Sequence, residues 1–136
     1  MCKLDDQAIR EICSNLKSNN ALCEINVKDN NITSTGCATL FDILPSVNTL
    51  KKIVLEGNPI VTGTSFKLLV SKNSLTELSL RRTQLNTAAF VDLCNLIRNN
   101  STLKKIGLTM IIPSNVLNAS SPITTFFVVL IFTYRY

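Results

Sequence analysis

Histidine is absent from the 136 residues of the sequence. This absence excludes Ser-His-Asp and Cys-His catalysis, because both use an imidazole as the general base. It also removes the commonest protein ligand for transition metals. Glycine-rich phosphate-binding loops are lacking as well. The adjacent carboxylates Asp5 and Asp6 are better interpreted as a helix start, where negative charge suits the helix dipole. We therefore expect a protein that is not an enzyme and that has no cofactor, no metal and no small-molecule substrate.

The cysteine pattern lacks every spacing that marks a metal site. The five cysteines include no Cys-x-x-Cys pair and do not follow zinc-finger spacing. We expect reduced thiols, buried in the core, as in cytosolic proteins. The opening residues MCKLDDQAIREIC are charged and hold no apolar stretch of a signal peptide. A cytoplasmic location is the expectation.

One pattern recurs four times along the chain. In LKKIVLEGNPI (50–60), leucine stands first, apolar residues fourth and sixth, asparagine ninth and an apolar residue eleventh. The same frame begins at Leu22, Leu75 and Leu103, so the starts are spaced 28, 25 and 28 residues apart. The copy at Leu103 departs from the frame at its end. A recurring period of this length indicates a repeat architecture.

The pattern resembles leucine-rich repeats of the ribonuclease-inhibitor-like subclass, and the resemblance runs from Cys2 to about Leu108. It implies an α/β fold: a right-handed solenoid, or horseshoe, with parallel strands on the concave side and helices on the convex side. The stack bends because strands lie about 4.8 Å apart, whereas helices need about 8–10 Å. Residues 1–108 would form the array, with a partial first repeat followed by three to four units. The ninth position (Cys2, Asn30, Asn58, Thr83) would satisfy backbone groups after each strand.

Local patterns place the expected elements within this frame. Period-two alternation predicts strands at 24–28, 52–56 and 77–81, with their fourth and sixth repeat positions buried. Helical spacing predicts a first helix over 5–18 and a second that begins near 33–35 and stops at Pro45. The third unit is three residues shorter, so its helix should be brief. Thr87 is the expected N-cap of the fourth helix.

Outward strand positions supply the candidate contact surface. The third position reads Glu24, Lys52, Glu77, Lys105, and the seventh reads Lys28, Glu56, Arg81, Thr109. In-register strands would place opposite charges side by side. The surface is then balanced in charge despite a net charge of +5 and three basic pairs, so nucleic acid is not an expected partner. The candidate partner-binding residues are Glu24, Asn26, Lys28, Lys52, Val54, Glu56, Glu77, Ser79, Arg81, Arg82 and Lys105.

These features predict a non-catalytic scaffold that binds a protein partner through the concave strand face. One alternative is a truncated repeat fragment or isoform with no independent binding role. Another is a regulatory protein like the GTPase activators for Ran, which share the repeat subclass with innate-immune receptor arrays and actin pointed-end cappers. Activation of a GTPase by a single arginine would then use Arg81 or Arg82.

Residues 109–136 form a divergent apolar tail with one charged residue, Arg135. Its apolar run is shorter than the 17–25 residues of a membrane-spanning helix. Membrane attachment is therefore the least favoured of three readings. The tail could instead cover the exposed end of the array, or be non-native sequence such as read-through.

Overall fold

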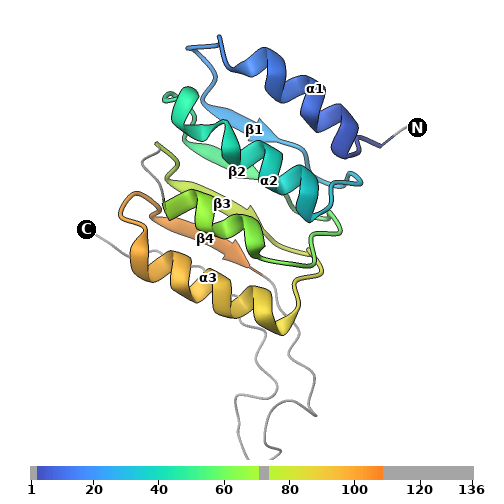
Figure 1. Ribbon diagram of the computed structural model, residues 1–136, viewed down its shortest axis with the longest axis vertical. Coiled ribbons are helices and arrows are strands. Elements are labelled where there is room, and N and C mark those ends of the chain that lie inside the picture. The colour runs from blue at the N-terminus through green and yellow to red at the C-terminus, as the bar shows by residue number, and fades with distance from the viewer. Residues whose placement is uncertain (1–2, 71–73, 109–136) are drawn as a thin grey trace, which may run out of the picture.

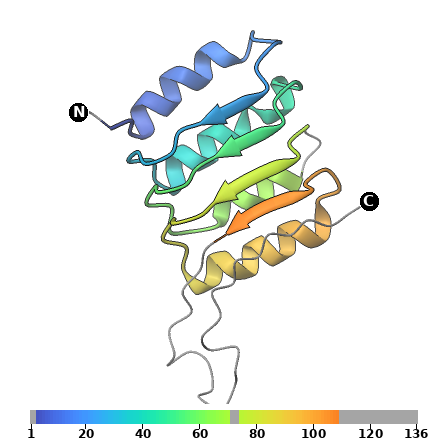
Figure 2. The ribbon, with the colours of Figure 1, turned by 180° about the vertical axis from the view of Figure 1, so that it is seen from behind.

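The computed structural model describes residues 3–70 and 74–108. Its fold is α/β, with the helices on one face of a four-stranded parallel sheet (Figure 1). Seen from behind, the strands face the viewer without a helix in front of them (Figure 2). The elements, in chain order, are α1 (Asp6–Leu16), β1 (Glu24–Asn26), α2 (Ser34–Asp42), the 3-10 helix η1 (Leu44–Ser46), β2 (Lys52–Val54), the 3-10 helix η2 (Thr64–Val70), β3 (Glu77–Leu80), α3 (Thr87–Asn99) and β4 (Lys105–Leu108).

The four strands lie side by side in chain order, β1-β2-β3-β4. Every pair is parallel, and the register aligns equivalent positions of the sequence pattern: Glu24 with Lys52, Lys52 with Glu77, and Glu77 with Lys105. The predicted parallel pairing is confirmed. Parallel neighbours need a crossover, and the helical segments supply it, all on one face.

The strands are shorter than expected, yet their parallel pairing continues past their ends. Backbone N–H groups of Val27 and Asp29 donate to the carbonyls of Val54 and Glu56, at 3.0 and 2.7 Å. The N–H of Gly57 donates to Arg81 at 3.0 Å. The segments that follow neighbouring strands therefore remain aligned through the eighth position of the pattern.

The core lies between the sheet and the helices. The fourth and sixth positions of the pattern point into it, as predicted, and are at most 8% exposed. Phe41 of α2 and Phe66 of η2 are fully buried there, with ring centroids 6.4 Å apart. This burial of large apolar side chains is the main stabilising contribution to such a fold.

Helix starts agree with the sequence prediction at two places and differ at one. Asp5 caps α1 by accepting from the N–H of Ala8 at 2.9 Å, and Thr33 caps α2. The prediction of Thr87 as the cap of α3 is wrong. Asn86 holds that position, because its backbone is extended and its side chain accepts from the N–H of Ala89 at 2.8 Å.

Two helical segments differ from the sequence prediction in where the helix ends or in the type of helix. Helix α2 ends at Asp42, and Pro45 lies in the short η1 that follows. The brief third helix is η2, which is 3-10 rather than α. Its unit has three residues fewer than its neighbours, and a 3-10 helix covers more length per residue than an α-helix. Phe66 and Leu69 still reach the core from it.

Side chains at the ninth position close the turns after β1, β2 and β3, as predicted. The buried amide of Asn58 donates to the carbonyls of Val27 and Leu55 at 2.9 and 3.0 Å and accepts from the N–H of Ile32 at 3.0 Å. Thr83 donates to the carbonyl of Leu80 at 2.7 Å. Asn30 bonds in the same manner as Asn58. Cys2, the fourth member of this predicted series, lies outside the described residues.

The cysteines follow the expectation only in part. Cys13 and Cys37 are buried free thiols, whereas Cys94 is half-buried and Cys23 is exposed. The prediction of burial is wrong for Cys23, because its position precedes the strand and points away from the core. Predictions for the tail, residues 109–136, also lie outside the described residues. Across 3–70 and 74–108, no helix is both long enough and apolar enough to cross a membrane.

Candidate interaction surface on the open face of the sheet

One face of the sheet carries no helix, and we call it the open face. Its residues come from the third, fifth and seventh positions of the repeated pattern and, after β1 and β3, from the eighth position. The open face consists of Glu24, Asn26, Lys28, Asp29, Lys52, Val54, Glu56, Glu77, Ser79, Arg81, Arg82, Lys105 and Gly107. All the residues predicted as contact candidates therefore share one surface.

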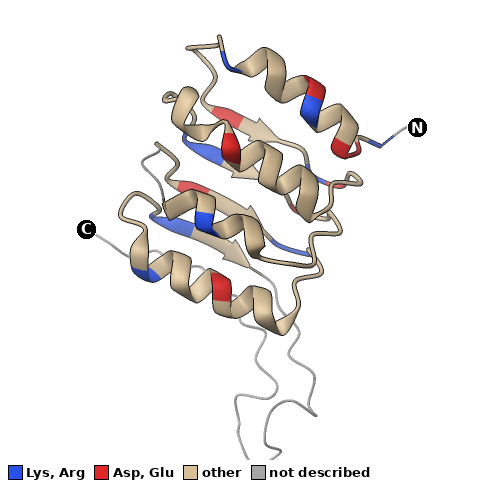
Figure 3. Cartoon of the chain, in the orientation of Figure 1, with Lys and Arg blue, Asp and Glu red and all other residues tan. Residues whose placement is uncertain are grey.

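The third positions form a ladder of alternating charge across the four strands (Figure 3). Lys52 lies 4.0 Å from the Glu24 carboxylate and 3.3 Å from that of Glu77. Lys105 approaches Glu77 from the other side at 3.9 Å. The predicted pairing at this level is confirmed. These side chains are 27–48% exposed, so each pair contributes modestly to stability.

The predicted ladder at the seventh position takes a different form. Within the described residues, Glu56 pairs with neither Lys28 nor Arg81. Its partner is Arg82, one position further along, at 3.9 Å, and Arg82 also reaches Asp29 at 3.2 Å. The chain turns after the strand, and Asp29 and Arg82 have positive φ angles of 57° and 54° there. This turn directs the eighth-position side chains along the rim of the sheet.

A hollow of about 210 Å³ lies in the open face over β2, β3 and β4. Val54 and Ser79 are only 6% and 8% exposed, so they form its floor rather than a contact surface of their own. The lining residues are Lys52, Val54, Glu56, Glu77, Ser79, Arg81, Lys105 and Gly107. Seven of the residues predicted from sequence thus surround one depression.

Gly107 was missed by the sequence prediction. It occupies the fifth position, where the other strands have Asn26, Val54 and Ser79. A Cβ atom at Gly107 would lie 2.9 Å from Ser79 Oγ and 3.2 Å from Arg81 Nε. The lack of a side chain therefore leaves room for Arg81 to lie across β4. The change to glycine at the fifth position of the last repeat was the sequence signal that could have indicated this space.

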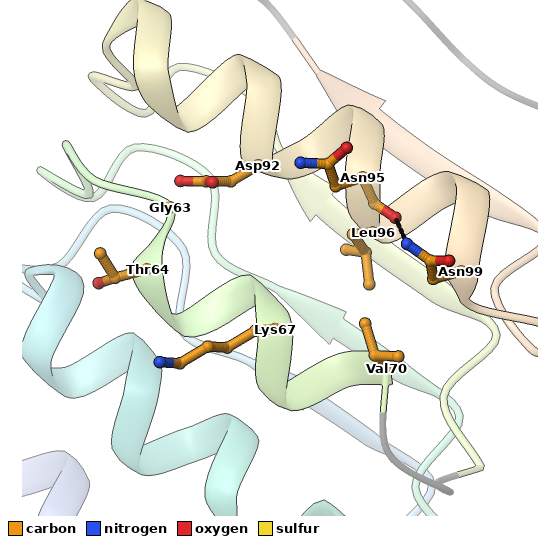
Figure 4. A pocket seen from close by; sticks show the side chains of 8 residues that line it. All are labelled: Gly63, Thr64, Lys67, Val70, Asp92, Asn95, Leu96 and Asn99. Atoms are coloured by element: carbon orange, nitrogen blue, oxygen red, sulfur yellow. Dashed lines mark hydrogen bonds between the residues drawn. The ribbon is translucent and has the colours of Figure 1, made fainter.

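A second hollow of about 400 Å³ lies on the helical side, between η2 and α3 (Figure 4). Val70 and Leu96 face one another across it, and Lys67 and Asp92 lie along it. Asn99 uses its amide to bond the carbonyl of Asn95 at 2.8 Å. None of the residues that line it was predicted as a contact residue.

Among residues 3–70 and 74–108, no group of three or more His, Cys, Asp and Glu side chains could hold a metal ion. Burial raises the pKa of the Cys37 thiol to about 12, although the hydrogen bond from Ser65 acts in the opposite direction. A thiol with such a pKa is a poor nucleophile. The described residues offer charged and hydrogen-bonding groups in fixed positions, which suits binding.

No protein-family model matches the chain, and no curated protein matches it. Among solved structures, the chain is similar to one described as "Leiomodin-1 Actin-Binding Site 2 (ABS2)", with a TM-score of 0.69 and 19% sequence identity. The match covers 80% of this chain and 66% of that chain, so the chain spans less than two thirds of that structure. At this level of identity the likeness concerns the fold alone. The chain therefore shares its α/β fold with the leiomodin-1 segment.

Proposed function

We propose that the chain is a leucine-rich repeat array of the ribonuclease-inhibitor-like subclass, folded as a right-handed solenoid. Its strands would line the concave side. The recurrence of one pattern at 28, 25 and 28 residues and the in-register parallel sheet support this assignment. The side chains of Asn30 and Asn58, which close successive turns in the same way, support it further.

We propose that the protein is a non-catalytic interaction module that binds a protein partner through the open face. The single observation that carries this proposal is the hollow over β2, β3 and β4, lined by charged side chains of both signs. Several of these side chains are already held by ion pairs, so less conformational entropy is lost when a partner binds. A surface of roughly 600–800 Å² on this side would lie at the lower end of standard interfaces.

Actin is the first partner to test, because the structurally similar protein is described as an actin-binding site of leiomodin-1. We place the protein in the cytoplasm, where an exposed free thiol such as Cys23 stays reduced. A direct titration with purified actin would be followed by fluorescence anisotropy of the labelled chain.

The proposal is tested by comparing two double charge reversals that change net charge equally. Lys28→Glu with Arg81→Glu alters the open face at two residues that form no ion pair within the described residues. Lys67→Glu with Arg98→Glu makes the same change on the helical side. Both variants would first be shown to fold by circular dichroism. Each would then be used in affinity capture with quantitative mass spectrometry and in the actin titration.

Loss of a captured protein with the open-face variant alone is the expected result. Equal capture by both variants and the unmodified chain would show that the open face is not the binding surface. Equal loss with both variants would indicate nonspecific attraction to the basic chain. Absence of actin binding, with another protein still lost selectively, would remove actin and leave the interaction surface in place.

A further inference from the structure

We propose that the hollow in the open face receives an acidic side chain of the partner protein. A glutamate or aspartate would enter the hollow, with its carboxylate held by Lys105 and by Arg81, which lies over Gly107. This inference rests on the proposed function, because it assigns the chemistry of the group that the open face recognises. It follows from how the charges around the hollow are distributed.

The acidic groups that line the hollow already have partners within the open face. The Glu77 carboxylate lies between Lys52 at 3.3 Å and Lys105 at 3.9 Å. Glu56 accepts a hydrogen bond from Ser79 Oγ at 2.5 Å and lies 3.9 Å from Arg82. A basic group from a partner would therefore have to displace an existing contact.

Among the charged residues that line the hollow, Arg81 is the one without an ionic partner in the described part of the chain. Within residues 3–70 and 74–108, its guanidinium forms no ion pair and no side-chain hydrogen bond, although it is half-buried. A guanidinium presents five N–H donors in a planar fork that matches a carboxylate. Partial burial weakens its hydration, so a carboxylate that approaches from solvent gains more than at a fully exposed arginine.

Gly107 lets the Arg81 guanidinium lie across β4 at the wall of the hollow, because a Cβ at Gly107 would lie 3.2 Å from Arg81 Nε. The hollow beside it has a volume of about 210 Å³. That volume is many times the roughly 10–15 Å³ that a cavity needs to hold one water molecule. The hollow therefore has room for a carboxylate group. Lys105, on the same strand, adds positive charge because it shares Glu77 with Lys52.

The charge balance of the face favours isolated protein carboxylates over a polyanion. Five basic residues face four acidic ones on the open face, which leaves an excess of one positive charge. Acidic side chains lie on β1 and β3 and at the turns after β1 and β2, so a nucleic-acid backbone would meet repulsion at each of them. A partner of mixed charge can place one acidic side chain in the hollow and avoid these positions.

Site-resolved NMR titration tests the inference. The probe is a short Gly-Ser peptide that carries two glutamates, and the matched probe carries glutamines at the same places. The glutamate peptide should shift the Arg81 Nε–Hε and Gly107 amide signals, whereas the glutamine peptide should leave them in place. Arg81→Gln should weaken glutamate-peptide binding about fivefold, near the upper end for a partly exposed ion pair. Arg98→Gln on α3 removes the same charge from the helical side and should leave binding unchanged.

A second variant probes the position of the guanidinium rather than its charge. Gly107→Ala would displace Arg81 and the Ser79 hydroxyl from above β4 while Arg81 keeps its charge, and it should also weaken binding of the glutamate peptide. The inference is overturned if both peptides bind equally, or if Arg81→Gln and Arg98→Gln reduce binding to the same degree. The proposed function is judged separately by the charge-reversal captures. Selective partner loss there, without any peptide effect here, would mean that the open face binds a protein by other chemistry.

Discussion

Arg82 and Asp29 are joined across a residue that has no side chain. Nη1 of Arg82 lies 3.2 Å from Oδ1 of Asp29, although the two residues are 53 positions apart in the sequence. Gly57, their equivalent in the intervening repeat, separates them. Its φ angle is 71°, and a Cβ there would lie 2.0 Å from Oδ1 of Asp29. The ion pair along the rim therefore depends on glycine at this position.

Gly57→Ala should destabilise the protein by about 1–3 kcal/mol, because it places a side chain at a positive φ and in contact with the Asp29 carboxylate. Urea unfolding followed by circular dichroism measures this change. In an Asp29→Ala background the steric part disappears, so the same substitution should have a smaller effect. Equal effects in both backgrounds would show that the Asp29 carboxylate does not restrict position 57.

Asn58→Ala should lower the free energy of unfolding by about 2–4 kcal/mol, because it leaves buried carbonyls and the N–H of Ile32 without their partner. Thr83→Val at the equivalent position removes one half-buried hydrogen bond and preserves side-chain volume. Its effect should be about 1 kcal/mol. Urea midpoints compare the two, and a similar loss for both would contradict the greater role of Asn58.

Glu77→Lys should destabilise the sheet by about 1–2 kcal/mol at low salt, since three lysines would then lie side by side on β2, β3 and β4. The effect should shrink as sodium chloride screens the repulsion. Glu24→Lys is the matched control, because Glu24 lies on the edge strand β1 and, among residues 3–70 and 74–108, forms an ion pair with Lys52 alone, at 4.0 Å. Thermal unfolding at low and high salt measures both. A loss that does not vary with salt would argue against charge repulsion.

Alkaline pH should destabilise the protein through Cys37. Burial raises the pKa of this thiol from 9.0 to about 12. Below pH 9 the thiol is protonated in both folded and unfolded chains. Between pH 9 and 12 only the unfolded chain loses the proton, so stability falls by up to about 1.4 kcal/mol per pH unit. Cys37→Ala should show a flatter decline between pH 8 and 10.5 in urea unfolding. Parallel slopes would remove Cys37 as the cause.

Asn86→Ala should destabilise the protein by about 1 kcal/mol, because it removes the acceptor that caps α3. Thr87→Ala, one residue later on the exposed start of the helix, should change stability by less than about 0.5 kcal/mol. Thermal unfolding of both variants distinguishes the two positions. The opposite order would restore Thr87 as the capping residue.

Much of the fold could be predicted because one pattern fixes several positions together. The spacing of the leucines predicted parallel strands in register, and therefore the ladder of Glu24, Lys52, Glu77 and Lys105. The ninth-position asparagines predicted the turns, since their amides can bond the backbone locally. The cap of α3 was mistaken because Asn86 and Thr87 are both good capping residues, and only backbone geometry selects between them.

By itself, the sequence determined which side chains point into the core and which lie on the open face, because the period-two alternation of a strand leaves no other choice. The tertiary structure alone decided how the outward charges pair. The turn after each strand directs Arg82, rather than Arg81, toward Glu56 and Asp29. It leaves Arg81 above Gly107, beside the hollow. A long side chain can reach several neighbours. Which neighbour it pairs with depends on the backbone angles of the turns and on where glycine leaves space, and the pattern of a single strand does not show either.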